Sequence, residues 1–157
     1  MSAEFDKILP TLVQGGVEFI LIGGVAAIIH GSARLTYDVD VVYARASANF
    51  KRLSETLKPF APYLRGAPPG LPFTFDDRTI RNGLNFTLTT RLGDLDLLGE
   101  VTGGGSYQDL LPHSLEVQAF GVRFKCVDLV TLIKLKRAAG RPKDLESLAE
   151  LQALLEG

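Results

Sequence analysis

Apolar and polar residues alternate in several short runs of the chain, which is the period of a β-strand. Residues 17–22 are mostly β-branched or aromatic and end at two glycines, so they predict a buried strand. Residues 38–43 alternate aspartate with valine, and residues 85–90 and 93–98 also predict strands. Residues 115–119 and 122–126 predict a hairpin that turns at Phe120 and Gly121.

Segments with helical signals lie between these strands in the first half of the chain. Residues 5–14 predict a leading helix that Pro10 interrupts or restricts to its first turn. Residues 25–30 predict a short helix directly after the glycines. Residues 46–60 predict a longer helix, with Ser47 as its N-cap and Pro59 as its stop.

Three further segments complete the pattern. Residues 59–72 hold five prolines and two glycines, so they predict an irregular segment at the surface. Asp128 is predicted to cap a helix that runs to Ala139, and Gly140 is predicted to end it. Pro142 then predicts the first turn of another helix.

Composition narrows the function classes. A length of 157 residues predicts one domain over residues 1–157, and 46% apolar residues are enough to build a core. With 17 basic and 18 acidic residues, a broad electrostatic nucleic-acid binder is disfavoured, and any RNA contact would be a local patch. No apolar run approaches the ~20 residues of a membrane span, and no signal-peptide pattern is present, so the expected location is the cytoplasm.

The candidate chemistry begins where the first predicted strand meets its glycines. Gly23 and Gly24 lead into a helix whose unpaired N–H groups favour an anion, and the missing side chains let a triphosphate approach the backbone. On the next strand, period two places Asp38 and Asp40 on one face. Two adjacent carboxylates are costly without a cation, and oxygen ligands suit Mg²⁺.

A third carboxylate lies in residues 93–98, which again alternate acid with leucine. Asp96 sits between two leucines, where a buried acid needs a cation or a hydrogen-bond partner. The predicted metal-binding and catalytic trio is therefore Asp38, Asp40 and Asp96, with Asp94 as the substitute if the register is shifted by two.

Gly23-Gly24, the run from Gly31 through Arg34 and Thr36 to Asp38 and Asp40, and the later Asp96 together resemble the minimal nucleotidyltransferases of the DNA polymerase beta superfamily, especially the bacterial abortive-infection and toxin-like branch. The tail from Leu135 to Leu145 is similar to the closing helix-turn-helix of that branch. The resemblance spans residues 17–155. Many relatives carry Gly-Ser where this chain has Gly-Gly, so no serine hydroxyl is available to the phosphates, although Gly-Gly is common in the toxin-like branch.

The resemblance implies an α/β (α+β) nucleotidyltransferase fold, with a mixed β-sheet flanked by helices and a C-terminal helix-turn-helix pair. It also implies two Mg²⁺ ions and transfer of a nucleoside monophosphate from an NTP to an acceptor hydroxyl. The acceptor would be an RNA 3′ end, such as that of a tRNA, or a protein side chain, and an antitoxin is a possible partner. The rival hypothesis is a non-catalytic nucleotide-binding or partner-binding module of a toxin–antitoxin system.

Basic and hydroxyl side chains supply the remaining candidates for nucleotide binding. Arg34 can hold a phosphate through two N–H groups or form an ion pair that steadies Asp38 or Asp40. Thr36 either belongs to the site or only begins the strand. The resemblance places Lys136, Arg141 and Lys143 beside the nucleotide, whereas the alternative is that basic residues at a helix end stabilise the helix dipole.

Overall fold

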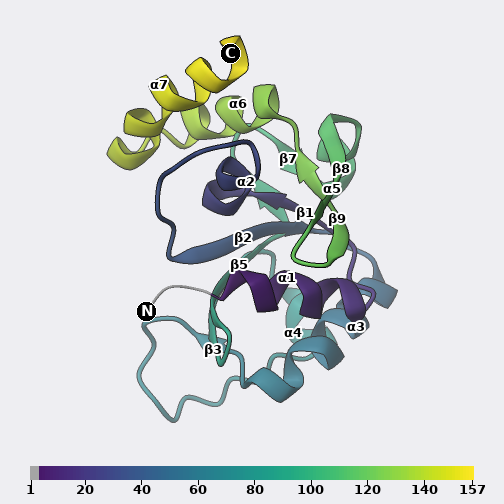
Figure 1. The fold of residues 1–157 in the computed structure, drawn as a ribbon. Coiled ribbons are helices and arrows are strands. Elements are labelled where there is room, and N and C mark those ends of the chain that lie inside the picture. Colours follow the sequence, from purple (N-terminus) through teal and green to yellow (C-terminus); the bar gives the residue numbers. More distant parts are fainter. Residues whose placement is uncertain (1–3) are drawn as a thin grey trace.

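The computed structural model describes residues 4–157, and a mixed seven-stranded sheet lies at its centre (Figure 1). The strands of this sheet are β1 (Phe19–Ile22), β2 (Asp38–Tyr43), β3 (Tyr63–Leu64), β4 (Phe86–Thr90), β5 (Gly93–Leu98), β8 (Ser114–Ala119) and β9 (Val122–Val127). Their order is β3-β4-β5-β2-β1-β9-β8. The pairs β2–β5 and β1–β9 are parallel and the other neighbours are antiparallel, which confirms the predicted mixed sheet.

Helices cover both faces of the sheet. They are α1 (Phe5–Gln14), α2 (Gly23–Ile29), α3 (Ser47–Leu57), α4 (Asp77–Asn82), α5 (Tyr107–Leu110), α6 (Leu129–Ala139) and α7 (Pro142–Glu156). Helices α6 and α7 lie beyond α2 on one side of the sheet, whereas α1, α3 and α4 lie on the other (Figure 1). A small hairpin, β6 (Glu100–Val101) with β7 (Gly105–Ser106), joins the sheet to α5.

The two central parallel strands carry their apolar side chains in matched pairs. Val39 pairs with Leu95 and Val41 with Leu97, and all four side chains are fully buried. Burying each such side chain contributes about 1.5–3 kcal/mol. Because alternate residues point to opposite faces, this packing fixes the aspartates of the same strands on the other face, toward α2, α6 and α7.

The C-terminal helix pair forms as the sequence predicts. The carboxylate of Asp128 accepts a hydrogen bond from the backbone N–H of Thr131 at 2.8 Å and caps α6. Gly140 ends α6 in the left-handed conformation, with φ of 64°, and Pro142 is the first residue of α7.

Several local predictions are wrong. Helix α1 continues through Pro10, because the buried residues Ile8, Leu9 and Leu12 lie before and after the proline in sequence and hold the helix against the core. Pro10 has no N–H to donate to the carbonyl of Asp6, and Asp6 is exposed to solvent.

The boundaries of α3 also differ from the prediction. Ala46, not Ser47, is the N-cap of α3, and no side chain caps it. The helix ends at Leu57, where a 3₁₀ turn over Lys58–Phe60 takes over. The segment expected to be irregular contains strand β3, which is only two residues long and therefore too short to show a strand period in the sequence.

Within the described residues, no helix combines the length and the apolar character that crossing a membrane requires.

Candidate active site

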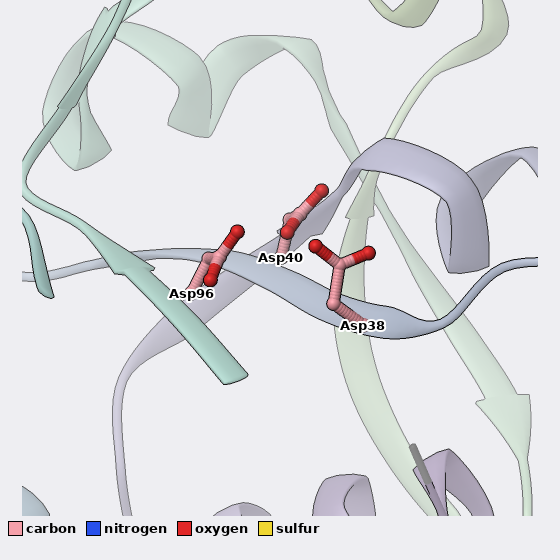
Figure 2. A group of neighbouring side chains, drawn as sticks. All are labelled: Asp38, Asp40 and Asp96. Atoms are coloured by element: carbon pink, nitrogen blue, oxygen red, sulfur yellow. The ribbon is translucent and has the colours of Figure 1, made fainter. Parts of the chain in front are cut away.

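The parallel pairing of β2 with β5 brings the predicted carboxylates together. Asp38 lies opposite Asp94 and Asp40 lies opposite Asp96, so two rows of acids cross the same face of the sheet. Oxygen atoms of Asp38, Asp40 and Asp96 all lie within 4.8 Å of one another. Figure 2 shows the three side chains projecting from one face of the two adjacent strands.

Burial and mutual repulsion make these carboxylates hard to ionise together. Burial raises the pKa of Asp40 well above its usual value, and the charges of Asp38 and Asp96 raise it further. Burial and the charge of Asp96 also raise the pKa of Asp38, although Lys143 and Arg65 partly offset this effect. A divalent cation would remove the repulsion, since an opposite charge favours the ionised form of a carboxyl group.

The donor set fits Mg²⁺. All the grouped ligand atoms are carboxylate oxygens, which are the ligands that this hard cation prefers. In addition, Oδ1 of Asp40 is buried and has no hydrogen-bond partner within residues 4–157. An unpaired buried carboxylate oxygen is costly unless a cation or a donor satisfies it.

The two glycines give the acids and the following loop room to approach α2. Gly23 has φ of 72°, and a Cβ atom there would lie 2.2 Å from Oδ2 of Asp40. A Cβ atom on Gly24 would lie 2.5 Å from Oγ1 of Thr36. The glycines therefore have a packing role toward Asp40 and Thr36, and the phosphate contact expected from the sequence stays a prediction.

Arg34 and Thr36 occupy the loop between α2 and β2. Arg34 donates a hydrogen bond to the carbonyl of Glu146 at 3.0 Å, and its Nε lies 3.9 Å from Oε1 of Glu150, so its observed partners are on α7. Within the described residues Arg34 forms no ion pair with Asp38 or Asp40, so this alternative is wrong. Thr36 donates its hydroxyl to the carbonyl of Asp38 at 3.2 Å and thereby shapes the entry to β2.

Lys136 and Arg141 both contact a buried acid, Asp144, that the sequence analysis missed. The Asp144 side chain is 1% exposed; its Oδ2 lies 2.6 Å from Nε of Arg141 and its Oδ1 lies 3.5 Å from Nζ of Lys136. Burial alone would raise the pKa of Asp144, but the hydrogen bonds and charge of Arg141 and the charge of Lys136 hold it below the usual value. An acid at the third position of a predicted helix, here two residues after Pro142, is a signal that could have identified Asp144.

Arg65 is the second residue that the sequence analysis missed. It follows β3, in the segment predicted to be irregular, and its guanidinium reaches the acids. Its Nη2 lies 2.7 Å from Oδ1 of Asp96, and its Nε lies 3.3 Å from Oδ2 of Asp94. No local pattern pointed to this residue, because its position depends on how three strands pair.

A cleft of about 570 Å³ separates the acidic face of the sheet from the start of α7. Leu35 and Tyr37 also line it, with 85% and 64% of their surfaces exposed, so the cleft contains apolar as well as charged surface. The charged and predicted residues that line this cleft are Gly24, Arg34, Thr36, Asp38, Asp40, Arg65, Asp94, Lys136, Arg141, Lys143 and Glu150. Gly23 lines an adjoining cavity of about 100 Å³ together with Asp40, Lys136, Arg141 and Asp144.

A mixed sheet with paired aspartates on adjacent parallel strands, helices on both faces and a closing helix pair is a nucleotidyltransferase fold. The chain is similar in structure to a lincosamide antibiotic adenylyltransferase, LnuA, solved with lincomycin bound. The TM-score is 0.62 over 96% of this chain and 96% of that chain, at 14% sequence identity, so the likeness establishes the fold. No protein-family model matches the chain, and neither does any curated protein.

Proposed function

We propose that this protein is a Mg²⁺-dependent nucleotidyltransferase that transfers a nucleoside monophosphate from an NTP to an acceptor hydroxyl. The observation that carries the proposal is the grouping of Asp38, Asp40 and Asp96 within 4.8 Å, beside a cleft that Asp38 and Asp40 line together with Lys136, Arg141 and Lys143. The shared fold with an adenylyltransferase supports the reaction class. The acting unit would be residues 1–157 as one domain, in the cytoplasm.

Each of the three carboxylates has a proposed role in binding metal. Asp38 and Asp40 would hold two Mg²⁺ ions, and Asp96 would complete the site of one of them. The bound ions would activate the acceptor hydroxyl and neutralise the leaving pyrophosphate. Arg65 engages Oδ1 of Asp96, and the other carboxylate oxygen, which has no hydrogen bond within residues 4–157, would bind the ion or accept the proton of the acceptor hydroxyl.

The basic wall of the cleft would bind the triphosphate. Lys143 lines the cleft, lowers the pKa of Asp38 by its charge and forms no ion pair within the described part of the chain. Lys136 and Arg141 also line the cleft, although Asp144 holds both. Arg34 would contact a phosphate from the opposite loop, and Gly23 and Gly24 would let the triphosphate approach the start of α2.

In the reaction, the acceptor oxygen forms a bond to the α-phosphorus while the bond from that phosphorus to the bridging oxygen of the pyrophosphate breaks. The acceptor would be an RNA 3′ end, such as that of a tRNA, or a protein side chain. The fold shared with an enzyme that acts on a lincosamide antibiotic adds the hydroxyl of a small molecule as a further acceptor class. Tyr37 and Leu35 offer apolar surface at the cleft for a base or for an acceptor.

The decisive experiment incubates the protein with each α-³²P-labelled NTP, Mg²⁺ and cell extract, and then separates RNA, protein and small molecules. The proposal expects label in one fraction, none with EDTA and none with Asp40→Asn. Asp77→Asn is the matched control, because Asp77 lies in α4, which packs against α3 on the other side of the sheet. Mg²⁺-independent labelling, or full labelling by Asp40→Asn, would contradict the proposal.

The same activity would suit the toxin of a toxin–antitoxin pair, with an antitoxin as partner, and a non-catalytic nucleotide-binding or partner-binding module is the alternative. A growth assay distinguishes the catalytic toxin from the non-catalytic module. Expression in a bacterial host should arrest growth with the wild-type protein and not with Asp40→Asn if toxicity depends on transfer. Equal growth arrest by both proteins, with NTP binding but no transfer, would support the binding module.

A further inference from the structure

Arg65 is the cation that lies within the acidic cluster. Its guanidinium contacts three of the four carboxylates on the two central strands: Nη2 is 2.7 Å from Asp96, Nε is 3.3 Å from Asp94 and Nη1 is 4.0 Å from Asp38. The Arg65 side chain is 28% exposed, so its charge is only partly screened by water. Arg65 also lowers the pKa of Asp38 by its charge.

Strand pairing explains how a residue so far away in sequence reaches the acids. Leu64 pairs with Leu88, and the backbone N–H of Arg65 donates to the carbonyl of Thr87 at 3.0 Å. Thr87 in turn pairs with Asp96, and Asp96 pairs with Asp40. Arg65 therefore stands in the same cross-strand row as two of the acids, on the same face, and its long side chain spans the intervening strand.

The contacts of Arg65 fall into two kinds. Nη2 also donates to the carbonyl of Leu88 at 2.8 Å, and Nε faces Asp94; neither partner belongs to the grouped metal ligands. The contacts with Asp96 and Asp38, in contrast, engage two of those three ligands. The first kind anchors the guanidinium at the site, and the second kind brings its charge into competition with any cation that the ligands bind.

We propose that Arg65 acts as a resident counter-cation of the acidic cluster, which weakens binding of a divalent cation until a nucleotide brings its own negative charge. The inference rests on the proposed function, because it takes Asp38, Asp40 and Asp96 as the metal ligands. Arg65 orients the carboxylates that it contacts without metal, and its positive charge repels the incoming ion. The phosphates of an NTP offset that repulsion, so metal and nucleotide bind together.

Binding of Mn²⁺, used as a paramagnetic probe in place of Mg²⁺, tests this inference without any catalytic turnover. Electron paramagnetic resonance of the free ion gives the affinity of wild type, Arg65→Met and Arg91→Met with no nucleotide present. We expect Arg65→Met to bind Mn²⁺ at least about tenfold more tightly than wild type, because that is the effect of removing one charge within ~5 Å of a divalent ion at the dielectric constant of water, and weaker screening enlarges it. Arg91→Met removes the same charge from an exposed turn and should match wild type.

Two further variants separate the effect of the Arg65 charge from the effect of changing its side chain. Arg65→Lys retains the charge and should stay close to wild type in Mn²⁺ affinity. Arg65→Gln retains a polar N–H donor without the charge and should behave like Arg65→Met. It provides a second neutral variant if methionine prevents folding. In EDTA, both neutral variants should unfold at lower temperature than Arg91→Met, because the carboxylates then repel one another without a counter-charge.

The outcomes separate the inference from the function on which it rests. Unchanged Mn²⁺ affinity in folded Arg65→Met and Arg65→Gln, with NTP-dependent Mn²⁺ binding intact in the wild type, would overturn the role of Arg65 alone and leave it as an anchor of the segment after β3. Failure of every protein to bind Mn²⁺, with or without NTP, would overturn both the proposed function and this inference.

Discussion

At the scale of single residues, Asp40 shows why this site is unfavourable for folding without a cation. Its carboxylate packs against the backbone of Gly23, has one oxygen without a partner within residues 4–157, and faces two other acids. Burial and these charges raise its pKa in the folded protein. A group with a raised pKa contributes stability below its unfolded pKa, and this contribution is lost as the pH rises through the folded value.

We therefore expect metal-free wild-type protein to lose stability as the pH rises from about 4 toward neutrality, relative to Asp40→Asn. The neutral amide does not titrate, so this variant should be as stable as wild type or more stable at pH 7 in EDTA. Differential scanning calorimetry at several pH values measures the difference, and comparing the two proteins cancels the other titrating groups. Identical pH profiles of stability for the two proteins would show that the pKa of Asp40 is not raised in the folded protein.

At the scale of elements, the junction of α6 with α7 depends on Asp144. This acid caps the first turn of α7 through the backbone N–H of Arg141 at 3.3 Å, and it also holds the side chains of Arg141 and Lys136. The junction thus fixes where two basic side chains lie in the cleft. The buried carboxylate of Asp144 therefore both stabilises the start of α7 and positions the two basic side chains.

Asp144→Asn should destabilise the protein by about 1–3 kcal/mol at pH 7, because it removes the charge-assisted hydrogen bonds of a buried acid while keeping its shape. The pKa of Asp144 is lowered in the folded protein, so the stability it provides is present above pH ~4 and is lost as the pH falls below that value. The difference from wild type in urea unfolding should shrink correspondingly in acid. The exposed Glu146, changed to Gln, is the control and should have little effect.

The start of α7 also provides the test of phosphate binding. Lys143→Ala should raise the KM for NTP roughly tenfold, which corresponds to ~1.4 kcal/mol, whereas Lys134→Ala on the exposed side of α6 should leave it unchanged. Added salt should weaken NTP binding more in the wild type than in Lys143→Ala. If the KM of the acceptor rises instead, with a shallower salt dependence, the lysine contacts RNA. Unchanged constants would leave Lys143 as a solvated side chain at a helix start.

At the scale of the whole molecule, the cleft has walls from distant parts of the chain. The acids come from β2 and β5 in the sheet, whereas Lys136, Arg141 and Lys143 come from α6, α7 and the loop that joins them. A ligand with both metal and phosphate would connect the two walls. Ligand binding should therefore stabilise the sheet and the C-terminal helix pair together.

NTP with Mg²⁺ at 100 times its Kd should stabilise the protein by about 2.7 kcal/mol, which raises Tm by roughly 5–10 °C for a chain of this size. The same NTP with EDTA should give a much smaller shift, because the phosphates would then face the acids without a cation. A thermal-shift titration measures both. An equal shift in EDTA would place nucleotide binding away from Asp38, Asp40 and Asp96.

The sequence by itself determined the parts of the protein that depend on local periodicity. Alternation along residues 38–43 and 93–98 predicted that the aspartates share a face, and the caps at Asp128 and Gly140 predicted the limits of α6. These features need only near neighbours in the chain, because the strand period and the helix caps are properties of a few consecutive residues.

Only the tertiary structure decided what depends on pairing between strands and packing between helices. The register of β2 against β5 grouped Asp96 with Asp38 and Asp40 and left Asp94 to face Arg65. Arg65 itself reached the acids through β4, and Arg34 turned to α7 instead of the acids. No local pattern carries such information, because register is set by how whole strands bury their apolar faces.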